Sequence, residues 1–287
     1  MKASELVLAP NGAPYHIHIN GEQMADNVIL VGDPGRVEIF KEIFETVEHE
    51  SINRELHALT GWYHEERFTA LSTGMGCDNI DIVMTELDVA ANIDLATGEI
   101  NPTPRRLNLV RIGTCGSLQA EIDCGTLVAS RYVIGLDGLL NYYDCSPTLF
   151  EQEMQQAFVE QMRFADCFAQ PYAVACSERL LESVGKGLKP VITATAPGFY
   201  APQGRHIRIA PAIKDFNERI ARFEWDGLLL TNLEMETSGI YGMARMFGHE
   251  ALTVCLVIAN RATGRFINDY EPIMKESIVR VLESFPR

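Results

Sequence analysis

Short runs of β-forming residues alternate with longer amphipathic runs along this chain of 287 residues. Runs rich in β-branched and apolar residues predict strands at residues 28–31, 68–72, 109–113, 126–134, 172–176 and 252–260. Runs with apolar residues three and four positions apart predict helices at residues 78–96, 147–165, 177–188 and 233–248. Strands that alternate with helices form sheets covered on both faces. We therefore expect an α/β fold, a single domain over residues 1–287 with a central mixed, largely parallel β-sheet flanked by helices.

Composition excludes several classes of protein. The net charge is −15 and no Lys/Arg-rich run of five residues occurs, so no nucleic-acid partner is expected. No apolar window reaches about 18 residues and the N-terminus lacks a basic region followed by an apolar one, which predicts a cytoplasmic protein with no membrane partner. The seven cysteines are scattered without a Cys-x-x-Cys pair, so we expect reduced, mostly buried thiols and no metal site. Residues 97–108 predict a surface loop within the domain.

Glycine and arginine residues follow two of the predicted strands. GDPGR (Gly32–Arg36) comes after the first strand, and RIGTCGS (Arg111–Ser117) continues a later one. Glycine lets the backbone approach a ligand closely, and arginine binds an oxyanion through two parallel hydrogen bonds. Arg111 lies in an apolar run and so needs an anionic partner or a full set of acceptors, while Thr114 between two glycines adds a hydroxyl. These features fit an anion site at the carboxyl ends of the strands; a plain turn and a structural Arg–Asp pair are the alternatives.

Two further motifs have both a structural and a functional interpretation. STGMGCDN (Ser72–Asn79) joins a strand to a helix, and Asp78 or Asn79 would cap that helix. Glu234 and Glu236 lie two residues apart at the predicted start of another helix, so they diverge and only one can enter a cleft. Carboxylates at this position stabilise the helix dipole. In the functional interpretation, Glu236 accepts hydrogen bonds from both hydroxyls of a ribose.

The segment Gly198–His206 combines aromatic and polar side chains. Phe199 and Tyr200 offer a stacking face, Gln203 both donates and accepts hydrogen bonds, and Arg205 donates them. This set matches the edge of a pyrimidine base.

Five motifs occur along the chain: GDPGR, RIGTCGS, EMETS, the QGR of Gln203–Arg205 and the ANR of Ala259–Arg261. Together they resemble those of the nucleoside phosphorylase-I family, the hexameric purine and uridine phosphorylase type. Within this family the chain is most similar to the uridine phosphorylases. The resemblance implies the nucleoside phosphorylase fold and reversible phosphorolysis of uridine to uracil and ribose 1-phosphate, a step of pyrimidine nucleoside salvage. It implies inorganic phosphate as a co-substrate and no resident cofactor.

The resemblance also assigns roles to matching positions. It implies that phosphate is bound by Gly32, Arg36, Arg54, Arg111 and Thr114, with Arg54 acting on the neighbouring subunit. It implies that ribose is bound by His16, Met235 and Glu236, with His16 also reaching the neighbour and His18 as the alternative histidine. It implies that the base is bound by Phe199, Gln203, Arg205 and Arg261. Catalysis would then rest on positioning and charge stabilisation by Arg36, Arg111, Glu236, Gln203 and Arg205. A homodimer is the expected minimal active unit, and the family implies a homohexamer.

Differences from the family pattern indicate whether the substrate carries a purine or a pyrimidine base. Purine-specific members have Ser-Asp-His after the corresponding strand, and the aspartate protonates the purine ring. This chain has Asn260 and Arg261 there, so we expect a pyrimidine substrate. Some uridine enzymes hold a potassium ion between subunits through a glutamate that matches Glu55, but their serine ligand is Asn79 here, which argues against the ion.

Two alternatives stay open. One is a purine nucleoside phosphorylase or nucleosidase of the same fold. The other is a non-catalytic nucleoside-binding protein, although no G-x-G-x-x-G follows the first strand. The motifs leave open whether uridine, deoxyuridine or thymidine is preferred.

Overall fold

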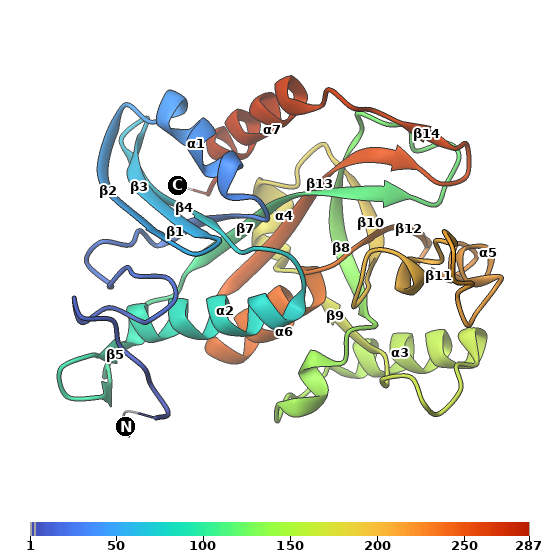
Figure 1. The fold of residues 1–287 in the computed structure, drawn as a ribbon, viewed down its shortest axis with the longest axis horizontal. Coiled ribbons are helices and arrows are strands. Elements are labelled where there is room, and N and C mark those ends of the chain that lie inside the picture. The colour runs from blue at the N-terminus through green and yellow to red at the C-terminus, as the bar shows by residue number, and fades with distance from the viewer. Residues whose placement is uncertain (1, 3, 287) are drawn as a thin grey trace. The chain divides into compact units, whose positions relative to one another are not determined.

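Helices and strands alternate in the computed structural model, which describes residues 2 and 4–286. It has a mixed α/β fold, as predicted, with helices on both faces of a mixed sheet (Figure 1). The chain divides into two compact units. The first runs to Ile112 and includes Met243–Ala251, and the second holds Gly113–Gly242 and the chain from Leu252 on. The expectation of a single domain over residues 1–287 stays a prediction.

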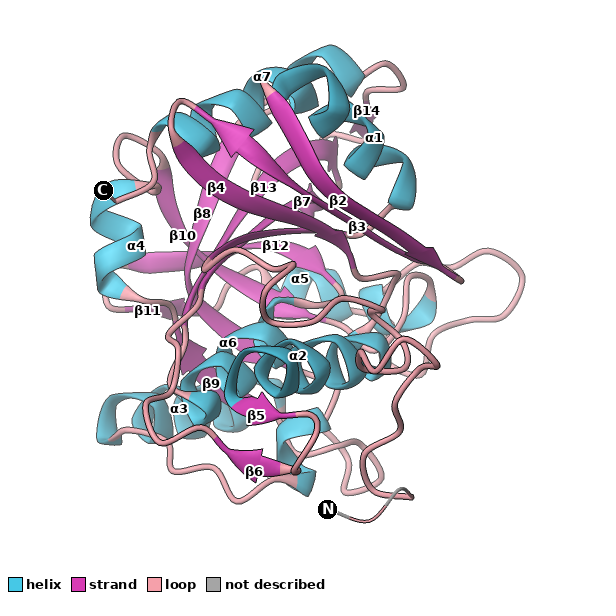
Figure 2. Cartoon of the chain, turned by 90° about the vertical axis from the view of Figure 1, so that its left-hand side faces the viewer, coloured by secondary structure: helices cyan, strands magenta, loops and turns pink. Residues whose placement is uncertain are grey.

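The first unit is built around strand β1 (Asn27–Val31). β1 pairs in parallel with β4 (Glu66–Ser72) on one side and with β7 (Asn108–Ser117) on the other. β3 (Leu56–Tyr63) joins β4 in antiparallel orientation and forms a long hairpin with β2 (Thr46–Asn53), visible in Figure 2. Val28–Val31 are fully buried, because a central parallel strand is covered on both faces. The segment before β1 is drawn as loop in Figure 2.

Helices of the first unit begin directly after its strands. α1 (Pro34–Ile43) packs on β3 and β4, and its N-cap Asp33 accepts a hydrogen bond from the Gly35 amide at 2.9 Å. The GDPGR motif is therefore a strand-to-helix junction rather than a plain turn. α2 (Cys77–Asn92) follows β4. A small hairpin of β5 (Ile93–Asp94) and β6 (Glu99–Ile100) follows α2, so the predicted loop 97–108 contains a short strand.

The predicted caps of α2 are wrong. Its N-cap is Gly76, with φ of +93° and no side-chain cap, and Asp78 and Asn79 lie inside the first turn. The reason is that the helix already starts at Cys77, where the chain leaves Gly76 in a conformation that glycine adopts without strain.

The second unit has its own set of strands. β8 (Leu127–Gly135) pairs in parallel with β10 (Lys189–Thr195), and β10 pairs in parallel with β12 (Leu228–Glu234). Antiparallel pairings add β9 (Tyr172–Ala175) and β13 (Glu250–Asn260) to β8, β14 (Arg265–Phe266) to β13, and β11 (Glu224–Trp225) to β12. The sheet is thus mixed, with parallel pairing along β8, β10 and β12.

Helices of the second unit are mostly short. They are α3 (Leu149–Met162), α4 (Glu178–Ser183), α5 (Phe216–Ile220), α6 (Thr237–Phe247) and α7 (Glu271–Glu283), with 3-10 turns η1 (Leu139–Tyr142) and η2 (Ala201–Gln203). The last residues of α6, from Met243 on, belong to the first unit. α3 begins with a capping box of Thr148 and Glu151, and it packs on β9 (Figure 1). Phe158 of α3 and Phe223 meet edge to face in the core, with ring centroids 5.1 Å apart.

One pairing changes two of the predicted boundaries. The end of β12 pairs antiparallel with the end of β7, with Asn232 opposite Ser117 and Leu233 opposite Gly116. This pairing extends β7 through Ser117, so Thr114 and its flanking glycines lie in a strand and not in a loop. The same pairing holds Asn232 and Leu233 in β12, and the parallel pairing of Glu234 with Thr195 of β10 carries the strand one residue further. The helix predicted from Leu233 therefore begins only at Thr237.

Across the described residues, we find no helix both long and apolar enough to cross a membrane. All seven cysteines are free, and four of them are buried.

Candidate active site

The predicted phosphate ligands of the first unit lie where its parallel strands end. Arg111 on β7 stands beside Leu30 of β1, two residues before Gly32. The turn after β4 lies against the turn after β1, because the Thr73 amide donates to Val31 O at 2.8 Å and the Cα of Gly32 faces Gly74 O. A side chain at Gly32 would start 3.6 Å from that oxygen. This edge of the sheet is where α/β proteins bind ligands.

Two arginines reach this edge from different elements. Arg36 is half-buried in the first turn of α1, and Arg111 is buried with an exposed fraction of 4%. The N-terminus of α1 adds backbone amides and the positive end of the helix dipole. Thr114 is half-buried further along β7, in the part of the strand that belongs to the second unit. The Gly32, Arg36 and Arg111 set therefore has the charge and the exposed backbone that a phosphate dianion requires.

The two residues predicted to serve the neighbouring subunit lie together in the first unit. The side-chain amide of Asn53 donates to the carbonyl oxygens of Tyr15 and His16 at 3.1 and 3.0 Å. Arg54, at the tip of the β2–β3 hairpin with φ of +56°, places its guanidinium 5.9 Å from the centroid of the Tyr15 ring. The hairpin tip and the N-terminal segment thus present His16 and Arg54 on one surface.

Glu55 and Asn79, the two positions compared with the potassium ligands of some uridine enzymes, lie next to each other. The Asn79 side chain turns its amide nitrogen toward the Glu55 carboxylate, at 3.4 Å. In this orientation the nitrogen, which is not a potassium ligand, faces Glu55. The expectation that no potassium ion binds here stays a prediction.

A second cluster of metal-ligand types lies on the β2–β3 hairpin and α1. Glu38, Glu50 and the buried His57 bring their ligand atoms together, and the Lys41 ammonium lies 2.6 Å from Glu50. The hydrogen bond that Lys41 donates to Glu50 lowers the pKa of Glu50 and raises the pKa of Lys41. The lysine already supplies the positive charge that an ion would bring, so we interpret the cluster as an ion-pair network.

The predicted base ligands come together in the second unit. The Arg205 guanidinium stacks on the Phe199 ring, 3.8 Å from its centroid. Its Nη1 donates to Phe199 O and, at 2.6 Å, to Oε1 of Gln203. Gln203 is buried, whereas Phe199 and its neighbour Tyr200 are exposed. The 3-10 turn η2 holds this geometry, and it ends at Gly204 with φ of +68°, where a side chain would collide with Asn217.

Arg261 completes this cluster. Its Nη2 donates to Gln203 O at 3.1 Å, and the Asn217 amide, in the orientation that satisfies both its atoms, bridges the same two residues. Neither Arg205 nor Arg261 forms an ion pair with a carboxylate among the described residues. Burial, and then the charge of Arg261, lower the pKa of Arg205 to about 10, and burial lowers that of Arg261. Two half-buried guanidinium groups without a carboxylate partner in the described chain are suited to stabilise negative charge on a ligand.

Glu234 and Glu236 have separate roles, as their spacing predicts. The Glu234 carboxylate accepts the Thr195 hydroxyl at 2.5 Å and the amides of Glu236 and Thr237 at 2.9 and 3.0 Å. It therefore caps the start of α6. Glu236 lies between the strand and the helix, is 5% exposed, and follows the half-buried Met235. Glu234 is therefore the residue of the pair that supports the start of α6.

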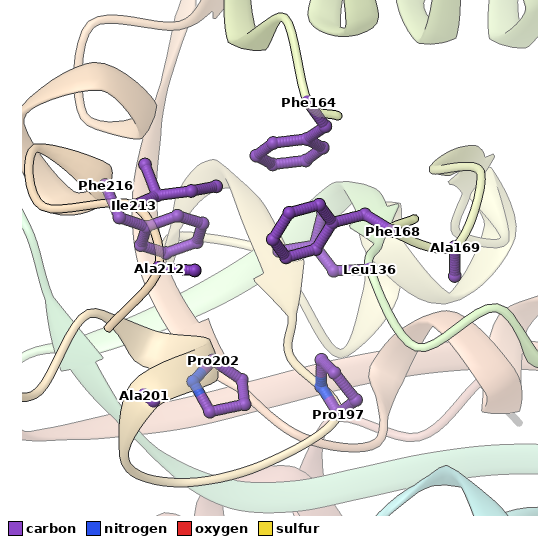
Figure 3. Close-up of a pocket in the computed structure, with 10 residues that line it drawn as sticks. All are labelled: Leu136, Phe164, Phe168, Ala169, Pro197, Ala201, Pro202, Ala212, Ile213 and Phe216. Atoms are coloured by element: carbon purple, nitrogen blue, oxygen red, sulfur yellow. The ribbon is translucent and has the colours of Figure 1, made fainter. Parts of the chain in front are cut away.

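An apolar cavity of about 200 Å³ lies behind the base-binding segment (Figure 3). Phe164, Phe168 and Phe216 face it from the segment after α3 and from α5, and Pro197 and Pro202 lie opposite (Figure 3). None of its lining side chains is polar. It therefore offers no side-chain hydrogen bond to the polar edge of a base, unlike the neighbouring cluster of Gln203 and Arg205.

Cys115 lies on β7 one residue after Thr114, and it is buried. Burial raises the pKa of its thiol well above the usual range. The thiolate, which is the nucleophilic form, is therefore disfavoured, as expected for a spectator cysteine.

Comparison with known proteins decides the family. The sequence pattern of the phosphorylase superfamily matches residues 26–285. The chain belongs to the phosphorylase superfamily. A uridine phosphorylase of Thermococcus kodakarensis is 28% identical over 260 residues, which cover 89% of this chain and 80% of that protein. A DeoD-type purine nucleoside phosphorylase of Caldanaerobacter subterraneus is 27% identical over 258 residues, which cover 86% of this chain and 89% of its own.

The fold agrees with this family. A nucleoside phosphorylase of Trypanosoma brucei, described as showing uridine phosphorylase activity, superposes with a TM-score of 0.88 at 27% identity. The superposition covers 97% of this phosphorylase and 98% of the Trypanosoma chain. The resemblance stated from five motifs is thus confirmed, as is the nucleoside phosphorylase fold.

Sequence reasoning missed three side chains of this phosphorylase that organise the predicted ligands. Asn53 ties the hairpin tip to the N-terminal segment, and Asn217 ties Gln203 to Arg261. Glu86 contacts His16. Each is a polar residue in a polar or amphipathic stretch, and no local pattern distinguishes it from a solvated side chain.

Proposed function

We propose that this phosphorylase is a uridine phosphorylase, which converts uridine and phosphate reversibly to uracil and ribose 1-phosphate. The observation that carries the proposal is the cluster of Phe199, Gln203, Arg205 and Arg261. Its stacked ring, its amide and its two guanidinium groups without carboxylate partners suit a base that leaves as an anion. The uridine phosphorylase of Thermococcus kodakarensis and the Trypanosoma brucei enzyme support it as relatives.

The chemistry follows from these groups. As the glycosidic bond lengthens, the sugar becomes positively charged and negative charge grows on the uracil carbonyl oxygens. Arg205 and the amide of Gln203 would donate hydrogen bonds to those oxygens, an interaction that strengthens as the charge develops. Glu236 would accept the ribose hydroxyls, and Arg36 and Arg111 would hold the phosphate that captures the anomeric carbon. No covalent intermediate is needed.

Asn260 argues for a pyrimidine over a purine. Its Nδ2 donates to Gln119 O and Ile122 O at 2.9 Å, and its Oδ1 accepts the amides of Ala262 and Thr263 at 3.0 and 2.9 Å. Both ends of the side chain are therefore engaged with backbone. An amide also has no proton to give to a purine ring, so the position that carries an acid in purine enzymes anchors loops here.

We also propose that His16 and Arg54 act in the site of a neighbouring subunit, with a homodimer as the smallest active unit within a homohexamer. Their placement on one surface, joined through Tyr15 and Asn53, supports delivery as a pair. Mixing tests this directly. Arg54→Ala and Arg205→Ala should each be nearly inactive alone, whereas a denatured and co-refolded mixture should regain a substantial part of wild-type activity. A mixture as inactive as its parents contradicts the shared site.

One incubation series tests the activity. The protein is mixed with uridine, thymidine or inosine, with and without phosphate, and the released base is measured. We expect uracil from uridine only when phosphate is present. Hypoxanthine as the main product identifies a purine enzyme, release without phosphate identifies a nucleosidase, and no release in any mixture indicates a binding protein.

A further inference from the structure

Glu86 is a buried carboxylate in the middle of α2. It has an exposed fraction of 9%, and apolar neighbours such as Val83, Leu87 and Ala90 share its burial. A carboxylate in such a place is costly unless hydrogen bonds satisfy it. An apolar residue would pack there without that cost, so the position calls for an explanation beyond stability.

The Glu86 carboxylate hydrogen-bonds to the N-terminal segment, about 70 residues earlier in the sequence. Oε2 of Glu86 accepts the backbone amides of His16 and Ile17, both at 2.8 Å. Oε1 lies 2.5 Å from Nδ1 of the His16 ring. One carboxylate therefore fixes both the backbone and the ring of His16.

This contact determines which ring nitrogen of His16 carries the proton. A carboxylate accepts hydrogen bonds and donates none, so Nδ1 must be protonated and must donate. In the neutral ring Nε2 is then the acceptor, and the His16 side chain is partly exposed, at 28%. In the Ser-His-Asp catalytic triad, a carboxylate holds the imidazole in one tautomer and orientation in the same way.

His18, the alternative histidine, has no such support. Its backbone is in the left-handed conformation, with φ of +55°, and its amide donates to Pro14 O. Within the described part of the chain, no carboxylate hydrogen-bonds to its ring. The geometry therefore favours His16 as the histidine that is prepared for a ligand.

We propose that Glu86 is a positioning residue, which holds His16 in the Nδ1-protonated tautomer so that Nε2 accepts the 5′-hydroxyl of the nucleoside bound by the neighbouring subunit. This inference rests on the proposed nucleoside phosphorylase activity. It adds a residue that does not touch the substrate and acts only through His16.

Glu86→Gln separates this role from packing. The glutamine has the same shape, but its single oxygen is taken by the two backbone amides. Its amino group then faces Nδ1, which can accept only if the proton moves to Nε2. The exchange should invert the tautomer of His16 while α2 stays intact.

The kinetic test compares uridine with 5′-deoxyuridine, which lacks the hydroxyl. Glu86→Gln should lower kcat/KM for uridine by about three- to tenfold, the effect of one hydrogen bond, and change that for 5′-deoxyuridine by less than about twofold. His16→Ala should show the same selectivity, and the double variant should add nothing to it. Glu99→Gln, an exposed residue on β6, is the control with the same charge change. An equal loss for both nucleosides indicates a structural role and overturns the proposal.

A second readout does not depend on activity. Magic-angle-spinning NMR of wild-type protein labelled with ¹⁵N-histidine reports the protonation of each ring nitrogen, and His16→Ala identifies the His16 signals by their loss. In the neutral ring we expect protonated Nδ1 and bare Nε2, and the reverse in Glu86→Gln. A neutral His16 ring with the proton on Nε2 in the wild type overturns the proposal. If the tautomer is as expected but no nucleoside is cleaved, only the proposed function fails.

Discussion

The cap that Glu234 provides for α6 should be essential for stability and for the position of Glu236. Its carboxylate accepts three hydrogen bonds, two of them from the buried amides of Glu236 and Thr237. Leaving two buried amides without an acceptor costs about 1–3 kcal/mol each, so Glu234→Ala should lose about 2–6 kcal/mol of folding free energy. At roughly 2–4 °C per kcal/mol for a chain of this size, the Tm should fall by about 5–20 °C.

Glu234→Gln should be milder. The glutamine keeps the shape and one oxygen for the two backbone amides. Its NH2 group can only donate, so the hydrogen bond with the Thr195 hydroxyl must reverse its direction, and we expect a loss of about 1–2 kcal/mol. Thermal unfolding gives the stability, and kcat/KM for uridine, measured well below each Tm, shows whether Glu236 has moved. Glu153→Ala, an exposed carboxylate on α3, controls for the lost charge. A Tm of Glu234→Ala within about 1 °C of that control, with unchanged kcat/KM, would refute the capping role.

Three further predictions concern the ligand sets and the hairpin. Arg54→Ala should cost at least about tenfold in phosphate KM or in kcat, the effect of one charge-assisted hydrogen bond, and unchanged steady-state kinetics would contradict its assignment. Arg205→Gln should lower kcat/KM for uridine by about 10- to 100-fold, mainly through kcat, because its hydrogen bond strengthens only as the base departs; a change confined to KM would argue against that role. Glu50→Gln should lower the Tm at neutral pH, and the difference in Tm from the wild type should shrink below about pH 4. Because the pKa of Glu50 is lowered in the folded protein, its ionised carboxylate contributes fully to the folding free energy above the pKa of an unfolded glutamate. That contribution is lost as the pH falls through the pKa of Glu50 in the folded state. A difference in Tm that is independent of pH would contradict the ion-pair network.

The sequence predicts the fold where burial is uniform. The run Val28–Val31 is apolar at every position, and it forms the central strand β1 that is covered on both faces. β2 was not predicted, because its sequence TVEHESIN is polar and mostly exposed at the edge of the sheet. β3, β10 and β12 were not predicted either. β7 was predicted to end at Gly113, because no local pattern reveals the pairing with β12 that extends it through Ser117.

One part of the candidate site can be predicted from local sequence, and another part cannot. Phe199, Gln203 and Arg205 lie within seven residues of one another, so one turn brings them together and the sequence alone predicts their cluster. Glu86 and His16 are 70 residues apart, and a glutamate on an amphipathic helix resembles a solvated one. Only the tertiary fold shows that this carboxylate points at the histidine.

The most direct test of the central claim is the ratio of kcat/KM for uridine to that for inosine at saturating phosphate, with ribose 1-phosphate measured as the product. We expect uridine to be preferred by at least about 100-fold, because of the cluster of Gln203, Arg205 and Arg261 and the anchored Asn260. Discrimination of this size arises when the buried hydrogen-bonding groups of a site fit one base and are left unpaired by the other. Equal or better phosphorolysis of inosine would contradict the pyrimidine assignment.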